Sequence, residues 1–490
     1  MYIKKRKILN FAIIARLLGI LLLIEAAFML VPFAVCFLYE ELETAKSFGL
    51  SILITVVVGL LGLFCKTESH EMGKREGFLL TGLTWVVFSF FGMLPFLFYD
   101  TGLNVASAFF ETMSGLTTTG ASTIASVEAM PHGILLWRAI THFIGGMGII
   151  LFTLAIIPML NKQSGIQLFN AEVTGITHEK VRPRISHTAK TLWLIYIILN
   201  ILLIAALWIG PMNLFEAICH SFSTIATGGF STRNDSIIAF DSNYVKIVIT
   251  IFMFLAGINF SLFYHLVHGD IKSLIKSDIT RWYIGAIIIL ILAVIGIELL
   301  ENPDFSRLPQ MLIDIPFQIV SSITSTGFNA TNFTAWQHAS IIVLILGMIM
   351  GSCAGSTAGG IKIDRVVLIC KNLKNELHKL LHPNTVLPLR INGKILGPEH
   401  VLKVSAFLLL FVLSTILGMI VLTLSGLNLQ DGLFASLSCI CNNGLGWGFT
   451  SVSYAGLNDI SKWVMSVLML IGRLEIFTVM VLFSKSFWSK

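Results

Sequence analysis

The sequence predicts an all-α integral membrane protein with ten transmembrane helices. Four quasi-equivalent helix–pore loop–helix repeats surround one axis, and an N-terminal helix pair precedes them. Three observations predict this fold. First, 55% of the 490 residues are hydrophobic and only 12% are charged, whereas soluble proteins carry about 25% charged residues. Second, the chain contains ten long apolar runs. Third, four short polar segments between these runs share one pattern.

The apolar runs define the predicted spans, because crossing a bilayer takes about 20 residues. They cover residues 8–38, 48–65, 78–98, 134–158, 191–209, 244–267, 282–300, 338–370, 402–424 and 460–485. The first run follows a basic N-terminus, as in a signal peptide. It is longer than a signal-peptide core of about 7–15 residues, and a second run follows, so a retained helix is predicted.

Basic residues predict the orientation of the spans, since cytoplasmic loops are enriched in lysine and arginine. Basic residues gather before the first run, after the second, fourth and sixth runs, and from Lys362 onward in the eighth. The connections 99–133 and 425–459 contain none, and 210–243 and 301–337 contain one arginine each. A multi-pass protein of the cell inner membrane with both termini in the cytoplasm is therefore predicted.

Charge distribution and cysteine usage exclude other classes of protein. The basic residues lie in short loops rather than in one domain, so no nucleic-acid partner is predicted, and membrane lipid is the expected surrounding. The seven cysteines are odd in number and mostly lie in apolar runs, which argues against a disulfide framework. Cys439 and Cys441 have no partner at metal-binding spacing and are predicted to be small packing residues.

A polar tip that contains glycine recurs after the third, fifth, seventh and ninth runs. Each tip ends a half-apolar segment too short to span the membrane: ASAFFETMSGLTTTGAS, LFEAICHSFSTIATGGF, IPFQIVSSITSTGFN and GLFASLSCICNNGLGWG. The segments align on Gly120, Gly228, Gly327 and Gly444. Such repetition predicts four copies of one unit. It divides the chain into an N-terminal helix pair, 1–76, and pore repeats at 77–190, 191–281, 282–401 and 402–490.

The tips predict a ring of backbone oxygens around a pore. Irregular backbone at membrane depth is tolerated only where protein buries it or where it lines an aqueous cavity. Four copies can aim their carbonyls at one axis, as in potassium-selective filters, and glycine permits the backbone angles required. A single tip would be an ordinary re-entrant loop, but four in register favour a filter. Its predicted residues are Thr118, Thr119, Gly120, Ala226, Thr227, Gly228, Ser325, Thr326, Gly327, Asn442, Asn443 and Gly444.

The chemistry of the tips favours a monovalent cation. A Ca²⁺ or Mg²⁺ site would need carboxylates, and the tips contain none. Glu111 and Glu216 lie further back on the half-helices. They are predicted to attract cations towards the mouth of the pore.

Further segments resemble the superfamily of potassium transporters that includes TrkH, KtrB and the plant HKT proteins. Besides the tips, they are WRAITHFIGGMGI (137–149), FLAGINFSLFYH (254–265), GSCAGSTAGGIKIDR (351–365) and GRLEIFT (472–478). The resemblance covers essentially the whole chain, and the N-terminal helix pair points to the TrkH/TrkG branch. Cys441 and Leu445 depart from the Asn and Pro usual in the family, and His142 replaces a common Gln. These departures bear on selectivity between potassium and sodium.

A stretch of small residues, GSCAGSTAGG, interrupts the eighth run. A glycine-mediated helix contact would explain Gly351 and Gly355, but the small residues continue beyond what a contact needs. The prediction is an intramembrane gate loop below the filter, which the resemblance also implies. The predicted gate comprises Gly351, Ser352, Cys353, Ala354, Gly355, Ser356, Thr357, Ala358, Gly359 and Gly360, together with Lys362 and Arg473.

Arg473 lies midway through the last run, where a charge costs about 2.5–3.5 kcal/mol on insertion scales and is usually partnered. Glu475 is two residues away and does not face it on a helix. The carbonyls of the gate loop are therefore its predicted partners. Arg138 and Lys362 lie near span ends, where snorkelling explains them as well as function does.

The cytoplasmic connections 159–190 and 371–401 are long and basic. Anchoring by positive charge accounts for them, and docking of a soluble regulator is the alternative. The resemblance implies a homodimer and a cytoplasmic TrkA-type nucleotide-binding subunit. The chain has no GxxxxGK[ST] sequence, so no organic cofactor is predicted on it.

Together these features predict potassium uptake across the cell membrane by the membrane subunit of a Trk-type system, with K⁺ as the transported ion. The alternative is a Na⁺- or H⁺-coupled potassium symporter, in which His142 and Glu216 could carry protons. Such transporters commonly use inverted repeats, whereas these four repeats share one orientation. An enzyme is not predicted, because no nucleophile–base pair, metal cluster or HExxH motif stands out.

Overall fold

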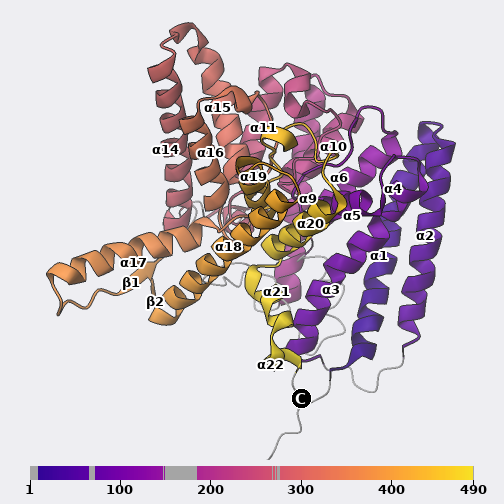
Figure 1. Ribbon diagram of the computed structural model, residues 1–490, viewed down its shortest axis with the longest axis horizontal. Coiled ribbons are helices and arrows are strands. Elements are labelled where there is room, and N and C mark those ends of the chain that lie inside the picture. Colours follow the sequence, from indigo (N-terminus) through magenta and orange to yellow (C-terminus); the bar gives the residue numbers. More distant parts are fainter. Residues whose placement is uncertain are drawn as a thin grey trace, which may run out of the picture.

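The computed structural model describes residues 9–65, 72–146, 148, 185–267, 269–270, 272 and 276–488. Within these residues the fold is helical apart from one two-stranded hairpin (Figure 1). The basic residues of 1–8, the end of the fourth apolar run from residue 149 and the connection 159–184 lie outside the described residues. The expectations for them stay predictions.

The N-terminal helices form a closely packed pair. α1 (Phe11–Leu38) and α2 (Leu42–Leu63) lie side by side at one edge of the molecule (Figure 1). A Cβ on Gly19 would lie 2.5 Å from the carbonyl oxygen of Gly59, and one on Gly62 would lie 2.8 Å from that of Ala15. Small residues allow such backbone approach between membrane helices.

Four short helices follow long ones at intervals along the chain. The long helices are α3 (Lys74–Gly92) with its continuation α4 (Leu94–Phe98), α9 (Ile185–Ile209), α14 (Asp278–Glu301) and α18 (Pro398–Leu424). The short helices are α5 (Val105–Leu116), α10 (Leu214–Ile225), α15 (Leu308–Ile323) and α19 (Leu429–Ile440). After each short helix and its tip the chain enters α6 (His132–Gly146), α11 (Asn243–Ala256), α16 (His338–Met350) and α20 (Asp459–Arg473), respectively.

The short helices begin at polar caps where the chain turns back. The side-chain oxygens of Asn104 and Asn213 accept hydrogen bonds of 2.9 and 2.8 Å from the backbone N–H groups of Ser107 and Glu216. This capping satisfies donors that a helix leaves open at its N-terminus. α15 instead starts with a proline in its first turn, a position where no N–H is needed.

Six helices among the described residues are long and apolar enough to cross a membrane, and two bent pairs raise the number to eight. The sequence predicts single helices over 244–267 and 460–485, and this is wrong in both cases. α11 and α12 (Phe260–Val267) meet at 97°, and α20 and α21 (Ile476–Phe483) meet at 114°. The interruption predicted in the eighth run is present, between α16 and α17 (Ile363–Leu381).

Helix α17 leaves the body of the protein and is followed by the hairpin (Figure 1). Strands β1 (Leu389–Ile391) and β2 (Lys394–Leu396) pair antiparallel across Asn392 and Gly393, which both have positive φ, as such a tight turn requires. The remaining short elements are α22 (Lys485–Trp488) and the 3₁₀ turns η2 (Ser236–Phe240), η3 (Phe305–Arg307), η4 (Phe333–Ala335) and η5 (Gly448–Thr450).

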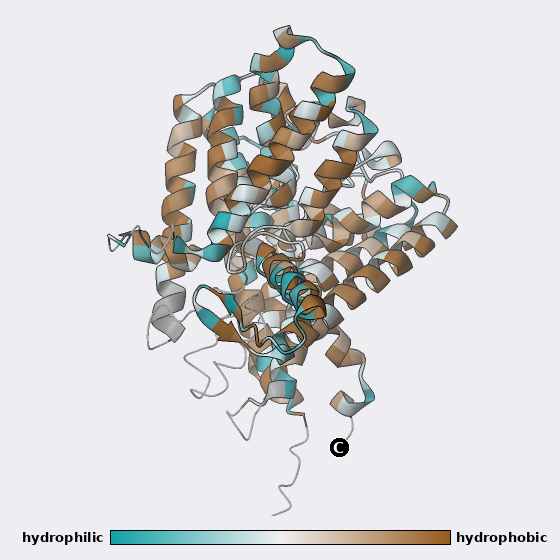
Figure 2. Cartoon of the chain, turned by 90° about the vertical axis from the view of Figure 1, so that its left-hand side faces the viewer, coloured by the Kyte–Doolittle hydropathy of each residue, from teal (hydrophilic) through white to brown (hydrophobic). Residues whose placement is uncertain are grey.

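The polarity of the molecule is that of a multi-pass membrane protein. Apolar residues dominate the long helices (Figure 2), and large apolar side chains such as Ile209, Ile289 and Leu424 are exposed. Many threonines, serines and charged groups lie buried in the interior. A solvent of lipid accounts for an apolar surface of this size, which a soluble protein would not expose.

Candidate functional site

Each short helix ends in the same turn. The residue after its C-cap is non-glycine yet has a positive φ between 51° and 54°. The next N–H donates a 2.7–2.9 Å hydrogen bond to a serine carbonyl five residues back, which is the Schellman arrangement. The left-handed residues are Thr118, Thr227, Ser325 and Asn442, and the serines are Ser114, Ser223, Ser321 and Ser438. Sequence reasoning did not single out the serines, although they recur at one position before each tip.

The four tips contact one another in a closed cycle. Each tip has a glycine with φ between +76° and +83°, so close to the next tip that a Cβ would come within 1.9–2.1 Å of a backbone carbonyl oxygen. The contacts run from Gly120 to Gly228, from Gly229 to Thr326, from Gly327 to Asn443 and from Gly444 to Thr119. Because the last contact returns to the first tip, the four tips form one closed ring of backbone contacts.

The second tip corrects the alignment made from the sequence. There the left-handed glycine is Gly229, with φ +83°, rather than Gly228. Gly228 therefore corresponds to Thr119, and Thr227 corresponds to Thr118, so Ala226 falls at the C-cap of the short helix. The sequence does not distinguish two adjacent glycines, because either can adopt a positive φ. The contact with the third tip decides which of them does so.

The loop 351–360 lies directly against three of the tips. The N–H of Gly359 donates to Ser325 Oγ at 2.6 Å, and Thr357 Oγ1 donates to the carbonyl of Ile225 at 3.0 Å. A Cβ on Gly359 would lie 2.1 Å from the carbonyl oxygen of Cys441. The loop thus touches the ends of the second, third and fourth short helices.

The bend between α11 and α12 holds the other side of this loop. The Cys353 N–H donates to the carbonyl of Gly257 at 3.1 Å, and the Phe260 N–H donates to the carbonyl of Gly355 at 3.0 Å. The Ala354 N–H donates to Asp364 Oδ1 at 2.8 Å. The break in the sixth apolar run has this physical reason: backbone groups that a continuous helix would use internally bind the loop instead.

Arg473 binds one carbonyl of the loop 351–360, as predicted, and one carbonyl of α6, which the sequence did not predict. Its Nη1 donates to the carbonyl of Thr357 at 2.9 Å, and its Nη2 donates to that of Gly145 at 2.7 Å. Lys362 Nζ donates to the carbonyl of Ala358, also in the loop. Two cationic side chains therefore bind loop carbonyls from the side of the polar cavity that Lys362 and Arg473 line.

Arg365 and Glu475 form an ion pair of 2.5 Å at the same cavity. Glu475 has a φ of +58° at the break between α20 and α21. A carboxylate at this depth needs a partner, since burying a lone charge is costly. The bend of the last apolar run places Glu475 where Arg365 can reach it.

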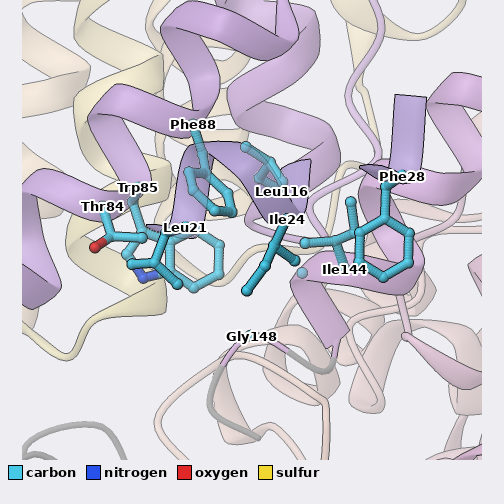
Figure 3. Close-up of a pocket in the computed structure, with 10 residues that line it drawn as sticks. Leu21, Ile24, Phe28, Thr84, Trp85, Phe88, Leu116, Ile144 and Gly148 are labelled. Atoms are coloured by element: carbon cyan, nitrogen blue, oxygen red, sulfur yellow. The ribbon is translucent and has the colours of Figure 1, made fainter. Parts of the chain in front are cut away.

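An apolar pocket lies between α1, α3 and α6 and shares Trp85 with the polar cavity (Figure 3). Phe28 and Ile24 line it from α1, and Phe88 lines it from α3. The Trp85 ring borders both this pocket and the polar cavity, 5.7 Å from the guanidinium of Arg473. The guanidinium of Arg473 therefore lies next to an aromatic ring that also borders an apolar pocket.

Glu111, which the sequence predicts to attract cations, is buried and paired with a cation of the protein itself. Its side chain is fully buried and accepts hydrogen bonds from Arg138 Nε at 2.8 Å and from the Thr123 N–H at 2.7 Å. Arg138 is 2% exposed and also donates to the carbonyl of Ser231, so snorkelling does not explain it. Glu216 caps α10 and pairs with Arg233 at 2.7 Å.

Breaking the Glu111–Arg138 pair is expected to destabilise the protein strongly. The variant R138M leaves the buried carboxylate of Glu111 without a compensating positive charge, and removal of one member of a buried pair costs about 3–5 kcal/mol. Thermal unfolding of the purified protein in detergent measures the effect. The double variant E111Q/R138M removes both charges and should recover most of the loss. Equal loss in the single and double variants would contradict this account.

Comparisons with known proteins agree over nearly the whole chain. A family model named TrkH and described as a cation transport protein matches residues 45–490. The Trk system potassium uptake protein TrkH of Salmonella typhimurium is 36% identical over 489 residues, which cover 98% of this chain and 100% of that protein. The Trk system potassium uptake protein TrkG of Escherichia coli K12 is 33% identical over 484 residues, which cover 97% and 98%, respectively.

A solved structure has the same fold. The crystal structure of the potassium transporter TrkH from Vibrio parahaemolyticus matches with a TM-score of 0.89 at 34% sequence identity. The match covers 98% of this chain and 100% of that chain.

Proposed function

This chain belongs to the TrkH family of cation transport proteins, and from that membership we propose that it takes up potassium across the cell inner membrane. It acts as the membrane subunit of a Trk-type system; its relatives are named Trk system potassium uptake proteins. The family is a family of transporters rather than of enzymes. The coupled-symporter alternative is not favoured by these relatives.

We propose that the four tips form the potassium filter. The observation that carries this is the closed cycle of contacts between glycines and carbonyls of successive tips. Rings of backbone carbonyls can replace the hydration shell of K⁺. The proposed residues are Thr118, Thr119, Gly120, Thr227, Gly228, Gly229, Ser325, Thr326, Gly327, Asn442, Asn443 and Gly444.

Backbone oxygens suit this role better than a side-chain site does. In the part of the chain that the structure describes, no group of three His, Cys, Asp or Glu side chains could hold a metal ion. The carboxylate nearest to the first tip in sequence, Glu111, already pairs with Arg138. Selection of the ion therefore rests on the spacing of carbonyls, which depends on how rigidly each tip is held.

The proposed gate is the loop 351–360 with Lys362 and Arg473. The loop contacts the ends of the second, third and fourth short helices, and its carbonyls accept hydrogen bonds from the two cationic side chains. Positive charge there repels cations, and the loop itself obstructs the path below the tips. Moving the loop requires breaking these hydrogen bonds.

The finer architecture is proposed on the same basis. Ten spans arranged as four pore repeats after an N-terminal pair require each bent pair, α16 and the fourth apolar run to count as one span each. The basic connections are proposed to lie on the cytoplasmic side of the inner membrane, together with both termini, because cytoplasmic loops are enriched in lysine and arginine. A homodimer and a cytoplasmic TrkA-type nucleotide-binding subunit complete the proposed assembly.

Flux measurements in liposomes test the proposed function. Purified protein is expected to give a reversal potential that follows the K⁺ gradient and is little affected by Na⁺ or H⁺ gradients. The physical reason is that uncharged carbonyls passively select one ion. A TrkA-type partner, added with nucleotide, should change the flux without moving the reversal potential. A potential set by the H⁺ or Na⁺ gradient would instead support the symporter.

A further inference from the structure

The second tip lacks the side-chain hydrogen bond that braces each of the other three, either within the tip or to the neighbouring short helix. In the first and third tips, a pair of threonine hydroxyls lies at 2.8 Å across the turn: Thr117 with Thr119, and Thr324 with Thr326. In the fourth tip, Asn443 Nδ2 donates to the carbonyl of Ser322 at 2.8 Å. The equivalent residues of the second tip are Ala226 and Gly228. Neither offers a polar side chain to hold the strand.

The ring of His142 occupies the place where a side chain of Gly228 would lie. A Cβ on Gly228 would come within 2.5–2.7 Å of Nδ1, Cγ and Cδ2 of this ring. The His142 side chain comes from α6, the helix that follows the first tip, and it is fully buried. The backbone of the second tip at Gly228 therefore packs against the imidazole ring of a residue from the preceding repeat.

Contacts on both sides hold this ring in place. His142 Nδ1 lies 3.1 Å from Ser223 Oγ, and the carbonyl of Ser223 accepts the N–H of Gly228 at 2.7 Å. The ring also stacks on Phe230 at 4.2 Å between centroids with an interplanar angle of 18°. Ser223 precedes the tip and Phe230 follows it, so one ring joins both ends of the second tip.

We propose that His142 is a positioning residue for the second tip and substitutes for the side-chain brace that Gly228 lacks. The inference rests on the proposed filter and identifies which residue sets its second carbonyl position. Without the ring, the strand at Gly228 is free to relax into the space it leaves. If one of the coordinating carbonyl oxygens is no longer held in position, the filter discriminates less well between K⁺ and the smaller Na⁺, because selectivity depends on the arrangement of those oxygens.

A double-mutant cycle tests this proposal by combining the variants H142A, G228T and H142A/G228T. The ratio of Rb⁺ to Na⁺ uptake in liposomes and the melting temperature in detergent are measured for each. H142A should lower the uptake ratio by about tenfold, since misplacing a positioned group by about 1 Å costs up to two orders of magnitude in activity. G228T should lower the melting temperature, because its Cβ meets the ring. The double variant, with the residue of the first and third tips at 228, should recover both quantities in part.

His132 provides a matched control on the same helix. Its ring also stacks on an aromatic side chain, Tyr39, at 3.8 Å, and its Nδ1 lies 2.9 Å from Glu41 Oε1. H132A removes the same side chain away from the tips and should leave the uptake ratio unchanged.

Three outcomes distinguish the claims. An uptake ratio in H142A equal to that of the wild type would overturn the role of His142. Strictly additive effects on melting temperature in the cycle would do the same, because they would show that residues 142 and 228 do not share the space. A wild-type protein without preference for Rb⁺ over Na⁺ would instead refute the proposed filter on which the inference depends.

Discussion

Substituting valine for any one of the left-handed tip glycines is expected to abolish selective uptake of potassium. The targets are Gly120, Gly229, Gly327 and Gly444. A non-glycine residue in this backbone region costs about 1–2 kcal/mol. More importantly, the new Cβ would lie 1.9–2.1 Å from a carbonyl oxygen of the next tip. That oxygen belongs to the proposed cage, so relieving the clash displaces the group that binds the ion.

Rubidium uptake by cells that lack other potassium uptake systems measures this effect, with protein quantified in the membrane fraction. Gly102 provides the control, because it also has a positive φ, +70°, but nothing lies within 4 Å of a Cβ built on it. G102V carries the backbone strain without the clash and should retain uptake. Uptake and Na⁺ exclusion like those of the wild type in all four tip variants would refute the filter.

The second large effect is expected from shortening the proposed gate loop, residues 351–360. Deletion of residues 356–358 removes Thr357, which donates to the carbonyl of Ile225 and accepts from Arg473 through its own carbonyl. It also places strain on the Gly359–Ser325 hydrogen bond. Each such bond contributes about 1 kcal/mol, and 1.4 kcal/mol is tenfold in an equilibrium. The open fraction, and with it the K⁺ flux, should rise by about tenfold or more.

The K⁺ flux into liposomes measures this change directly. The variant R473M, which keeps the loop intact but removes the two hydrogen bonds to Thr357 and Gly145, should raise the flux in the same direction by a smaller factor. The reversal potential should stay that of K⁺ in both variants, because the tips are unchanged. A lower flux through the deletion variant, at equal insertion, would show that the loop supports the pore instead of obstructing it.

Features that depend on local composition were accessible from the sequence. The apolar runs predict helices because hydrocarbon requires backbone groups to be satisfied within the segment. The clustering of Gly, Ala, Ser and Thr at 351–360 predicts a break because these residues form helices poorly, and α16 and α17 are separated there. The four polar tips were recognisable for the same reason.

Features that depend on contacts between distant segments were not accessible. The choice between Gly228 and Gly229 is made by Thr326, about 100 residues away in the sequence. The bend at Gly257 exists because its carbonyl binds Cys353. The burial of Glu111 depends on its contacts with Arg138 and Thr123, which lie elsewhere in the chain. The composition of these segments does not indicate which distant residues they contact.

The sequence by itself determined that this is a membrane protein with four polar, glycine-bearing tips and one interrupted helix, because membrane burial and helix propensity act on neighbouring residues. Only the tertiary structure decided which backbone groups meet: the cycle of glycines and carbonyls, the partners of Arg473, and the place of His142 beside Gly228. Those pairings join residues of different repeats, and their energies arise only once the repeats pack together.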